Sequence, residues 1–127
     1  MLLELDFSTD MPIYLQIRNQ VVMGIADGRL AAGERLPTIR ALAVESGINM
    51  MTVSKAYALL KQEGYIQTGR RSGAVVCGEI SGRGLLAPKA RQSLQLLIAE
   101  AALSGVSKQD FLELCTQIYD ETEGAKV

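Results

Sequence analysis

The spacing of Ala43, Gly47 and Val53 constrains the fold of this 127-residue chain more than any other feature. A helix-turn-helix needs a small residue in its first helix, so that the second helix can cross it closely. It also needs a glycine in the turn, where the backbone adopts positive φ. The second helix needs an apolar inner face, and Val53, Ala56 and Leu60 supply one at the i, i+3, i+7 spacing. The pattern therefore predicts two short helices that meet at Gly47.

The neighbouring segments predict one helix before this corner and a β-hairpin after it. Capping residues and a proline at 8–12 predict the start of the first helix, and Gly28 its end. The two corner helices are expected over 38–46 and 49–63. Two β-prone runs, "YIQT" and "AVVC", flank the turn-rich "GRRSG" as in a hairpin, and residues 35–36 are a candidate third strand. This is the order of a winged helix-turn-helix, whereas an ordinary helical hairpin in another all-α protein would leave the strands unexplained.

The last third of the chain predicts a separate two-helix tail. The glycine-rich "GEISGRG" is a flexible joint, and two amphipathic helices follow it. The first has Pro88 near its start and ends at Gly105, and the second is capped by Ser107. Both are too short to be stable alone in water, so they must pack on something. We therefore expect a winged domain over 1–79 and a tail over 80–127, in a mainly α-helical chain.

The apolar stripe of the tail has two interpretations. It either extends the core of the winged domain within one chain or buries itself against a second copy. A single winged module, if it binds DNA, contacts few base pairs, and a two-fold dimer doubles the length of sequence that is recognised. We therefore favour dimerisation. An effector would be expected at the dimer interface, since one tail is too small to enclose a drug-sized ligand easily. The stripe consists of Leu94, Leu97, Ile98, Ala101, Phe111, Leu112 and Ile118.

The residue types argue against an enzyme, a metal site and a secreted or membrane protein. The chain has no histidine, and Cys77 and Cys115 are too far apart in sequence for clustered zinc ligands. Both cysteines are expected to be buried or half-buried. The sequence has no phosphate-binding loop and no nucleophile elbow, so we predict no catalytic residue, metal or cofactor. An acidic start and the lack of an apolar run of about 20 residues predict a soluble, cytoplasmic protein.

Charge favours DNA binding once it is counted locally. The whole chain carries a net charge of -1, but residues 35–71 hold six basic residues and two acidic ones, a local net charge of +4. Phosphate attraction acts within roughly 8–10 Å at ordinary salt concentration, so the local sign matters more than the total. The balance argues against a non-specific nucleic-acid binder and not against a specific one.

From Met11 to Val76 the chain resembles the GntR family of bacterial transcription regulators. The segments that carry the resemblance are "MPIYLQI", "GRLAAGERLPTIRALA", "GINMMTVSKAYALLKQEGYI" and "RSGAVV". The "TVSKAY" wording and the short tail are most similar to the YtrA-type branch. The resemblance implies a dimeric repressor that binds a palindromic double-stranded DNA operator. Its recognition helix would enter the major groove and its wing the minor groove.

The resemblance also implies which residues contact DNA. In the family the arginine that follows "LP" in the second helix contacts DNA, and here that residue is Arg40. Thr38, at the start of the same helix, would direct its hydroxyl at a phosphate. The start of the recognition helix would contact bases, with Met50 packed inward and Met51 near a thymine methyl group. The wing tip would supply the remaining contacts. The positions are Thr38, Arg40, Asn49, Met51, Thr52, Ser54, Lys55, Arg70, Arg71, Ser72 and Gly73.

Two other interpretations stay open. One is a winged-helix protein-interaction module that does not bind DNA, in which alanine at Arg40, Lys55 and Arg70 would leave the function intact. The other is the detached regulatory half of an aminotransferase-like regulator. The capped tail helices argue against it, because a truncated fusion would continue into an unstructured linker.

Overall fold

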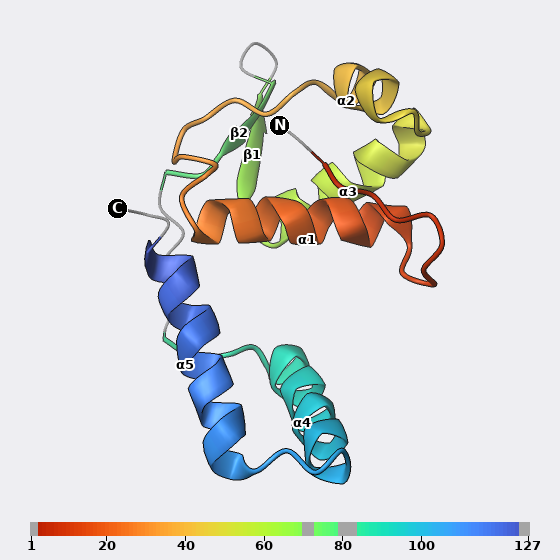
Figure 1. Cartoon of the computed structure of the whole chain (residues 1–127). Helices are drawn as coiled ribbons and strands as arrows, with labels where there is room; N and C mark the ends of the chain where they lie inside the picture. The colour runs from red at the N-terminus through yellow and green to blue at the C-terminus, as the bar shows by residue number, and fades with distance from the viewer. Residues whose placement is uncertain (1–2, 70–72, 79–83, 125–127) are drawn as a thin grey trace. The chain divides into compact units, whose positions relative to one another are not determined.

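The computed structural model describes residues 3–69, 73–78 and 84–124. Its elements are α1 (Ile13–Ala26), α2 (Ile39–Ser46), α3 (Met50–Gln62), β1 (Ile66–Gly69), β2 (Gly73–Val76), α4 (Pro88–Leu103) and α5 (Lys108–Gly124) (Figure 1). These residues form two compact units, one ending at Gly78 and the other beginning at Gly84. None of the described helices is long and apolar enough to cross a membrane. The first unit has the predicted order of three helices and a hairpin, which is that of a winged helix-turn-helix.

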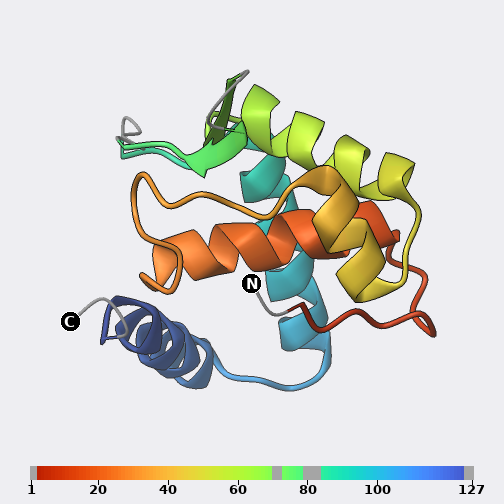
Figure 2. The same cartoon turned by 90° about the horizontal axis from the view of Figure 1, so that it is seen from above.

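One apolar core holds the first unit together. Helices α1 and α3 lie alongside each other, and α2 lies at the end where α3 begins (Figures 1 and 2). The predicted inner face of α3 is confirmed, because Val53, Ala56 and Leu60 are fully buried and pack with Ile17 and Val21 of α1. The other buried members of the core are Leu30, Leu36, Leu42, Ala43, Tyr57, Ile66, Ala74 and Val76.

Side-chain caps begin α2 and α3, and one left-handed glycine turns the chain between them. The Thr38 hydroxyl oxygen accepts a hydrogen bond from the Ala41 amide at 3.0 Å, and Asn49 Oδ1 accepts one from the Met51 amide at 2.7 Å. Gly47 follows α2 with a φ of 68°, a backbone conformation that is strained for residues with a side chain. The predicted positions of both helix starts and of the turn are therefore confirmed to within about a residue.

The start of α1 differs from the prediction, which placed capping residues first and Pro12 after them in the first turn. Pro12 occupies the cap position itself, the helix begins at Ile13, and no side chain caps it. The buried Gln16 instead donates from Nε2 to the carbonyl oxygen of Met11 at 3.0 Å. The capping pattern could not indicate this bond, because the donor lies inside the helix and not before it.

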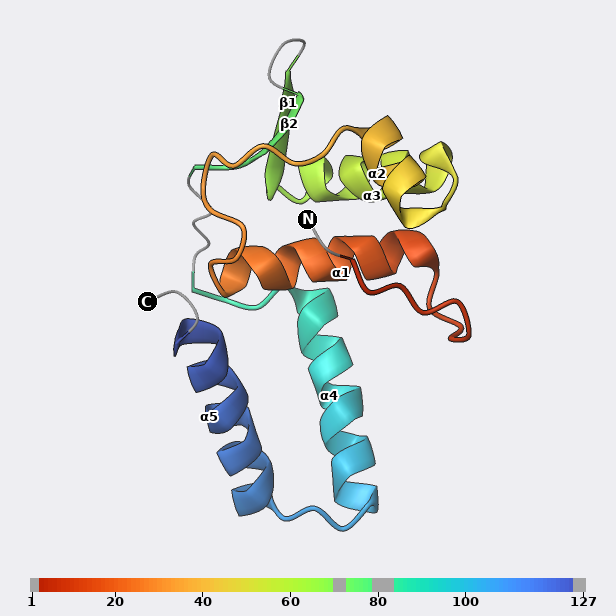
Figure 3. The same ribbon diagram turned by 45° about the horizontal axis from the view of Figure 1, so that its top comes forward.

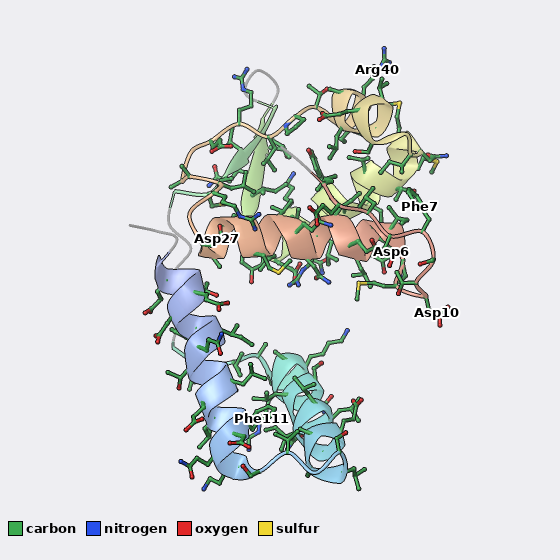
Figure 4. The ribbon with its side chains drawn as sticks, in the orientation of Figure 1. Asp6, Phe7, Asp10, Asp27, Arg40 and Phe111 are labelled. Carbon is green, nitrogen blue, oxygen red and sulfur yellow. The ribbon has the colours of Figure 1, made fainter. Side chains whose placement is uncertain are left out.

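The amides of two glutamines hold the extended N-terminal segment along α1, an arrangement we call the N-terminal clasp. Gln16 accepts a hydrogen bond from the Asp6 amide at 2.8 Å and donates one to the Asp6 carbonyl, also at 2.8 Å. Gln20 makes the same pair of bonds with Glu4, at 2.9 and 2.6 Å. Leu5 lies between the two clasped residues and packs against the core. Figure 4 shows this segment, with Asp6 labelled beside α1.

The hairpin confirms both predicted strands, whereas the candidate third strand is present only as a single β-bridge. β1 and β2 pair antiparallel, with Ile66 opposite Val76, and project beyond the helices (Figure 3). Arg35 forms an isolated bridge with Val75, and the Leu36 amide donates to the Ala74 carbonyl at 2.8 Å. The segment before α2 is thereby joined to the wing, which links the start of α2 to the hairpin through hydrogen bonds.

The second unit, α4 with α5, buries almost nothing by itself. Pro88 begins α4, and the Ser107 hydroxyl accepts from the Asp110 amide at 3.1 Å, as predicted. No described residue of this unit is buried, and its large apolar side chains are largely exposed. Cys115 is consequently exposed, which contradicts the prediction that both cysteines are covered, whereas Cys77 in the first unit is buried. The prediction was wrong at Cys115 because α4 and α5 do not cover each other.

Candidate nucleic-acid interface

An open trough brings side chains of α2, α3 and both strands together. It has a volume of about 510 Å³ and is lined by the predicted contacts Thr38, Arg40, Ser54 and Gly73. Lys61 and Thr68 also line it, and the sequence had not singled them out as contacts. Arg40 projects from α2 away from α1 (Figure 4). A duplex laid over this trough would meet the start of one helix, the outer side of the next and the base of the wing.

A second hollow lies on the other side of α3, against the start of α1. It has a volume of about 870 Å³ and is lined by the predicted contacts Met51, Thr52 and Lys55, while Ser54 borders both hollows. The Lys55 ammonium lies 4.1 Å from the centre of the Tyr14 ring. This cation–π contact holds the ammonium group towards α1. The sequence placed Tyr14 only on an apolar helix face, because nothing local indicates a contact between residues so far apart.

Thr38 and Asn49 keep hydrogen-bond donors available after capping their helices. The side-chain oxygen of each residue accepts a hydrogen bond from a backbone amide of its own helix. The hydroxyl hydrogen of Thr38 and the amide hydrogens of Asn49 remain available as donors. Both stand at helix N-termini, where the helix dipole and free N–H groups favour anions such as phosphate.

Both methionines at the start of α3 face solvent. Met51 is 79% exposed, as expected for a groove-facing residue, but Met50 is 45% exposed and does not pack inward as predicted. Met50 is the first residue of α3, whereas the buried face begins at Val53. The start of the recognition helix is therefore more apolar on its outer surface than the sequence indicated.

The basic side chains of this face are not neutralised by neighbouring acids. Among the residues that the structure describes, Arg35, Arg40, Lys55 and Lys61 form no ion pair. The acid nearest the end of α3, Glu63, is held instead by Arg18 through two bonds of 2.9 and 2.6 Å. That hydrogen-bonded carboxylate raises the pKa of Arg18 above its ordinary value. The predicted wing-tip contacts Arg70, Arg71 and Ser72 lie outside the described residues.

Tyr57 ties α3 to the segment that leads into α2. Its hydroxyl donates to the Pro37 carbonyl at 2.7 Å, one residue before the cap Thr38. Burial raises the pKa of Tyr57 to about 12, so the hydroxyl remains a protonated donor at neutral pH. The bond fixes the start of α2 relative to α3 and so fixes Thr38 and Arg40 relative to the trough.

We expect Tyr57→Phe to lower the free energy of unfolding by roughly 1 kcal/mol, since it leaves the Pro37 carbonyl without this donor. Affinity for DNA should fall as well, because the start of α2 loses one of its fixed points. Urea denaturation followed by circular dichroism measures the first effect. Tyr119→Phe is the matched control, because Tyr119 is 67% exposed on α5. Equal stability of the two variants would contradict the role given to this hydrogen bond.

Comparison with known sequences places the chain among regulators of transcription. Residues 13–76 match the family model of bacterial regulatory proteins, gntR family. Over 128 aligned residues the chain is 32% identical to the HTH-type transcriptional repressor YtrA of Bacillus subtilis. This alignment covers 98% of each protein, so it includes the tail as well as the winged unit.

Comparison with solved structures gives the same result for the fold. A structure described as YtrA from Sulfolobus acidocaldarius, a GntR-family transcription factor, is 35% identical with a TM-score of 0.59. The match covers 94% of this chain and 97% of that one. A protein from Listeria monocytogenes described as a transcriptional antiterminator is 25% identical with a TM-score of 0.81, over 100% of this chain and 94% of its own.

Proposed function

Since this chain belongs to the gntR family of bacterial regulatory proteins, we propose that it is a homodimeric repressor that binds a palindromic DNA operator. It is a DNA-binding regulator of transcription, as the members of this family are. The proposal concerns the way in which the protein binds its operator and the effect of this binding on transcription. Two recognition helices would enter major-groove segments about one helical turn apart, and the bound dimer would block polymerase. The naming of the Bacillus subtilis relative as a repressor supports this direction of control.

One observation carries the proposed contacts. Thr38 and Arg40 at the start of α2, Ser54 of α3 and Gly73 of β2 line a single trough, although they come from three separate parts of the fold. We propose that Thr38 and Arg40 bind phosphate and that Asn49, Met51, Thr52 and Ser54 face the bases. Lys55 would bind phosphate at the groove edge. The wing, with Arg70, Arg71, Ser72 and Gly73, would enter the minor groove.

The bare apolar faces of α4 and α5 support dimerisation through the tail. Leu97, Ile98 and Leu112 are 54%, 46% and 53% exposed. Such exposure of large apolar side chains is more typical of a subunit separated from its partner than of a monomeric protein. Leu94, Ile98, Ala101, Phe111 and Leu112 line a groove of about 480 Å³ between the two helices. Phe111 lies on the side of α5 that faces α4 (Figure 4).

We place a small-molecule effector, where one acts, at this same dimer interface. The groove falls within the range of about 300–1,000 Å³ that is usual for ligand sites, and a second copy would close its open side. The protein would act in the cytoplasm as a regulator and not as an enzyme.

The test of DNA binding is fluorescence anisotropy on the DNA upstream of the protein's own gene, with a scrambled duplex for comparison, over a range of salt concentrations. Binding should be specific, and log affinity should fall steeply with log salt because phosphate contacts release counterions. Arg40→Ala should weaken binding by roughly tenfold and reduce the salt slope by about 1. Arg29→Ala is the matched control, since Arg29 is paired with Asp27 just beyond the end of α1.

Equal and weak binding to both duplexes would exclude regulation of its own gene and require a search for operators elsewhere. If no duplex is bound specifically, and Arg40→Ala changes nothing, the protein-interaction interpretation replaces this one.

A further inference from the structure

The outer surface of α3 has an unusual chemistry for a helix that reads bases. The exposed residues of the helix between Met50 and Ala58 are Met50, Met51, Ser54, Lys55 and Ala58. Ser54 and Ala58, one turn apart, border the hollows on both sides of the helix. Their short side chains let the helix axis approach the floor of a groove closely. The longer side chains that then reach the base edges are the two methionines.

The side chains that usually distinguish guanine and adenine are few at the start of α3 and are engaged elsewhere. Guanine is commonly read by arginine or lysine, and adenine by asparagine or glutamine. Helix α3 contains no arginine, and its one amide side chain, Gln62, is at its last position. The cap residue Asn49 lies just before the helix, but its Oδ1 already accepts a hydrogen bond from the Met51 amide, so it lacks the free acceptor that bidentate contact with adenine uses. Ser54 can hydrogen-bond to any base and discriminates poorly.

The two lysines of α3 are also poorly placed for base readout near the helix start. Lys55 is held over the Tyr14 ring at 4.1 Å, on the side of α1. Lys61 lies seven residues beyond Ser54, which is roughly 10 Å further along the helix axis. Base contacts in helix-turn-helix proteins come mainly from the start of the recognition helix. Both lysines therefore suit phosphates at the groove edges better than bases.

We infer that α3 reads thymine methyl groups: the base pairs facing Met50, Met51 and Ala58 are A·T pairs, recognised by apolar contact with the thymine C5-methyl group. This inference rests on the proposed function, because it concerns the operator that the protein would repress. An apolar side chain in the major groove has one distinctive apolar partner, and that partner is this methyl group. The thioether of methionine is flexible and polarisable, so it adapts to the position of the methyl group.

The experiment begins with selection of bound duplexes from a random library by the full-length protein. The selected consensus is then resynthesised with deoxyuridine in place of thymidine, one position at a time, and affinities are measured by anisotropy. Uracil pairs as thymine does but lacks the methyl group. Each contacted methyl should be worth about fourfold in affinity, the value of one buried methyl-sized group. In Met51→Ala, uracil should cost nothing at the position that Met51 contacts, a coupling that a double-mutant cycle measures.

Met23→Ala is the matched control, because Met23 is also exposed, at 55%, but lies on α1 away from the trough. It should keep the full preference for thymine over uracil. A consensus with G·C pairs facing α3, or one whose affinity is unchanged by uracil, would overturn the inference while leaving the repressor proposal standing. If the library yields no preferred sequence, the proposed function fails, and the inference fails with it.

Discussion

Replacing Ile98 and Leu112 together by aspartate is expected to convert the protein into a monomer and to lower its operator affinity by roughly 100-fold or more. Both residues line the groove between α4 and α5, so the change puts two charges at the centre of the proposed dimer interface. An unpaired charge cannot be buried there without a large desolvation cost. Loss of the second subunit removes simultaneous contact with two half-sites, which is the main source of the expected change in affinity.

Sedimentation equilibrium measures the first part of this prediction and anisotropy the second. The winged unit should stay folded, since its core consists of residues from Ile17 to Val76 and includes none from the tail. Leu103→Asp is the control, because Leu103 lies on α4, is 90% exposed and does not line the groove. A double variant that still sediments as a dimer would show that the subunits associate elsewhere.

Leu60→Ala is expected to lower the free energy of unfolding by about 2–5 kcal/mol, the largest effect on stability that we predict for one substitution. Leu60 is fully buried where α3 meets the core of the winged unit. The small core has few side chains that could move into the resulting cavity. Because the whole domain is stable by only about 5–15 kcal/mol, the variant should lose much of its specific DNA binding near physiological temperature.

Urea denaturation at fixed protein concentration tests the effect of Leu60→Ala, with Leu103→Ala as control. The control removes the same atoms from a side chain that is 90% exposed, and its stability should change by less than about 0.5 kcal/mol. Similar midpoints for the two variants would mean that the core tolerates the cavity and that Leu60 is not essential to it.

The sequence predicted the winged unit well because its signals are local. Thr38, Gly47 and Asn49 each act on backbone groups within a few residues, so their identities were enough to place the corner. The two β-prone runs "YIQT" and "AVVC" on either side of a turn-rich segment likewise indicated the hairpin without knowledge of the rest. The inner face of α3 followed from helical spacing alone.

The features that could not be predicted from the sequence depend on contacts between residues far apart in the chain, or on the absence of a covering surface. Two contacts join α1 to α3 or to its C-cap across some 40 residues. They are the cation–π contact of Lys55 with Tyr14 and the ion pair of Arg18 with Glu63. Met50 and Cys115 were predicted to be covered because they are apolar, yet the described part of the chain leaves both exposed. Periodicity identifies an apolar face but not the surface that covers it.

The N-terminal clasp depends on a match between two repeat lengths. Two residues of an extended segment advance by about 6.6 Å, and four residues of a helix rise by about 6 Å. Gln16 and Gln20, four apart on α1, therefore meet the peptide groups of Asp6 and Glu4, two apart on the segment. Each side-chain amide offers one donor and one acceptor to a peptide group, so this helix face stands in for a neighbouring strand. Since only the main chain of Glu4 and Asp6 is bound in this way, the placement of the segment is encoded in α1 and not in the segment's own polar side chains.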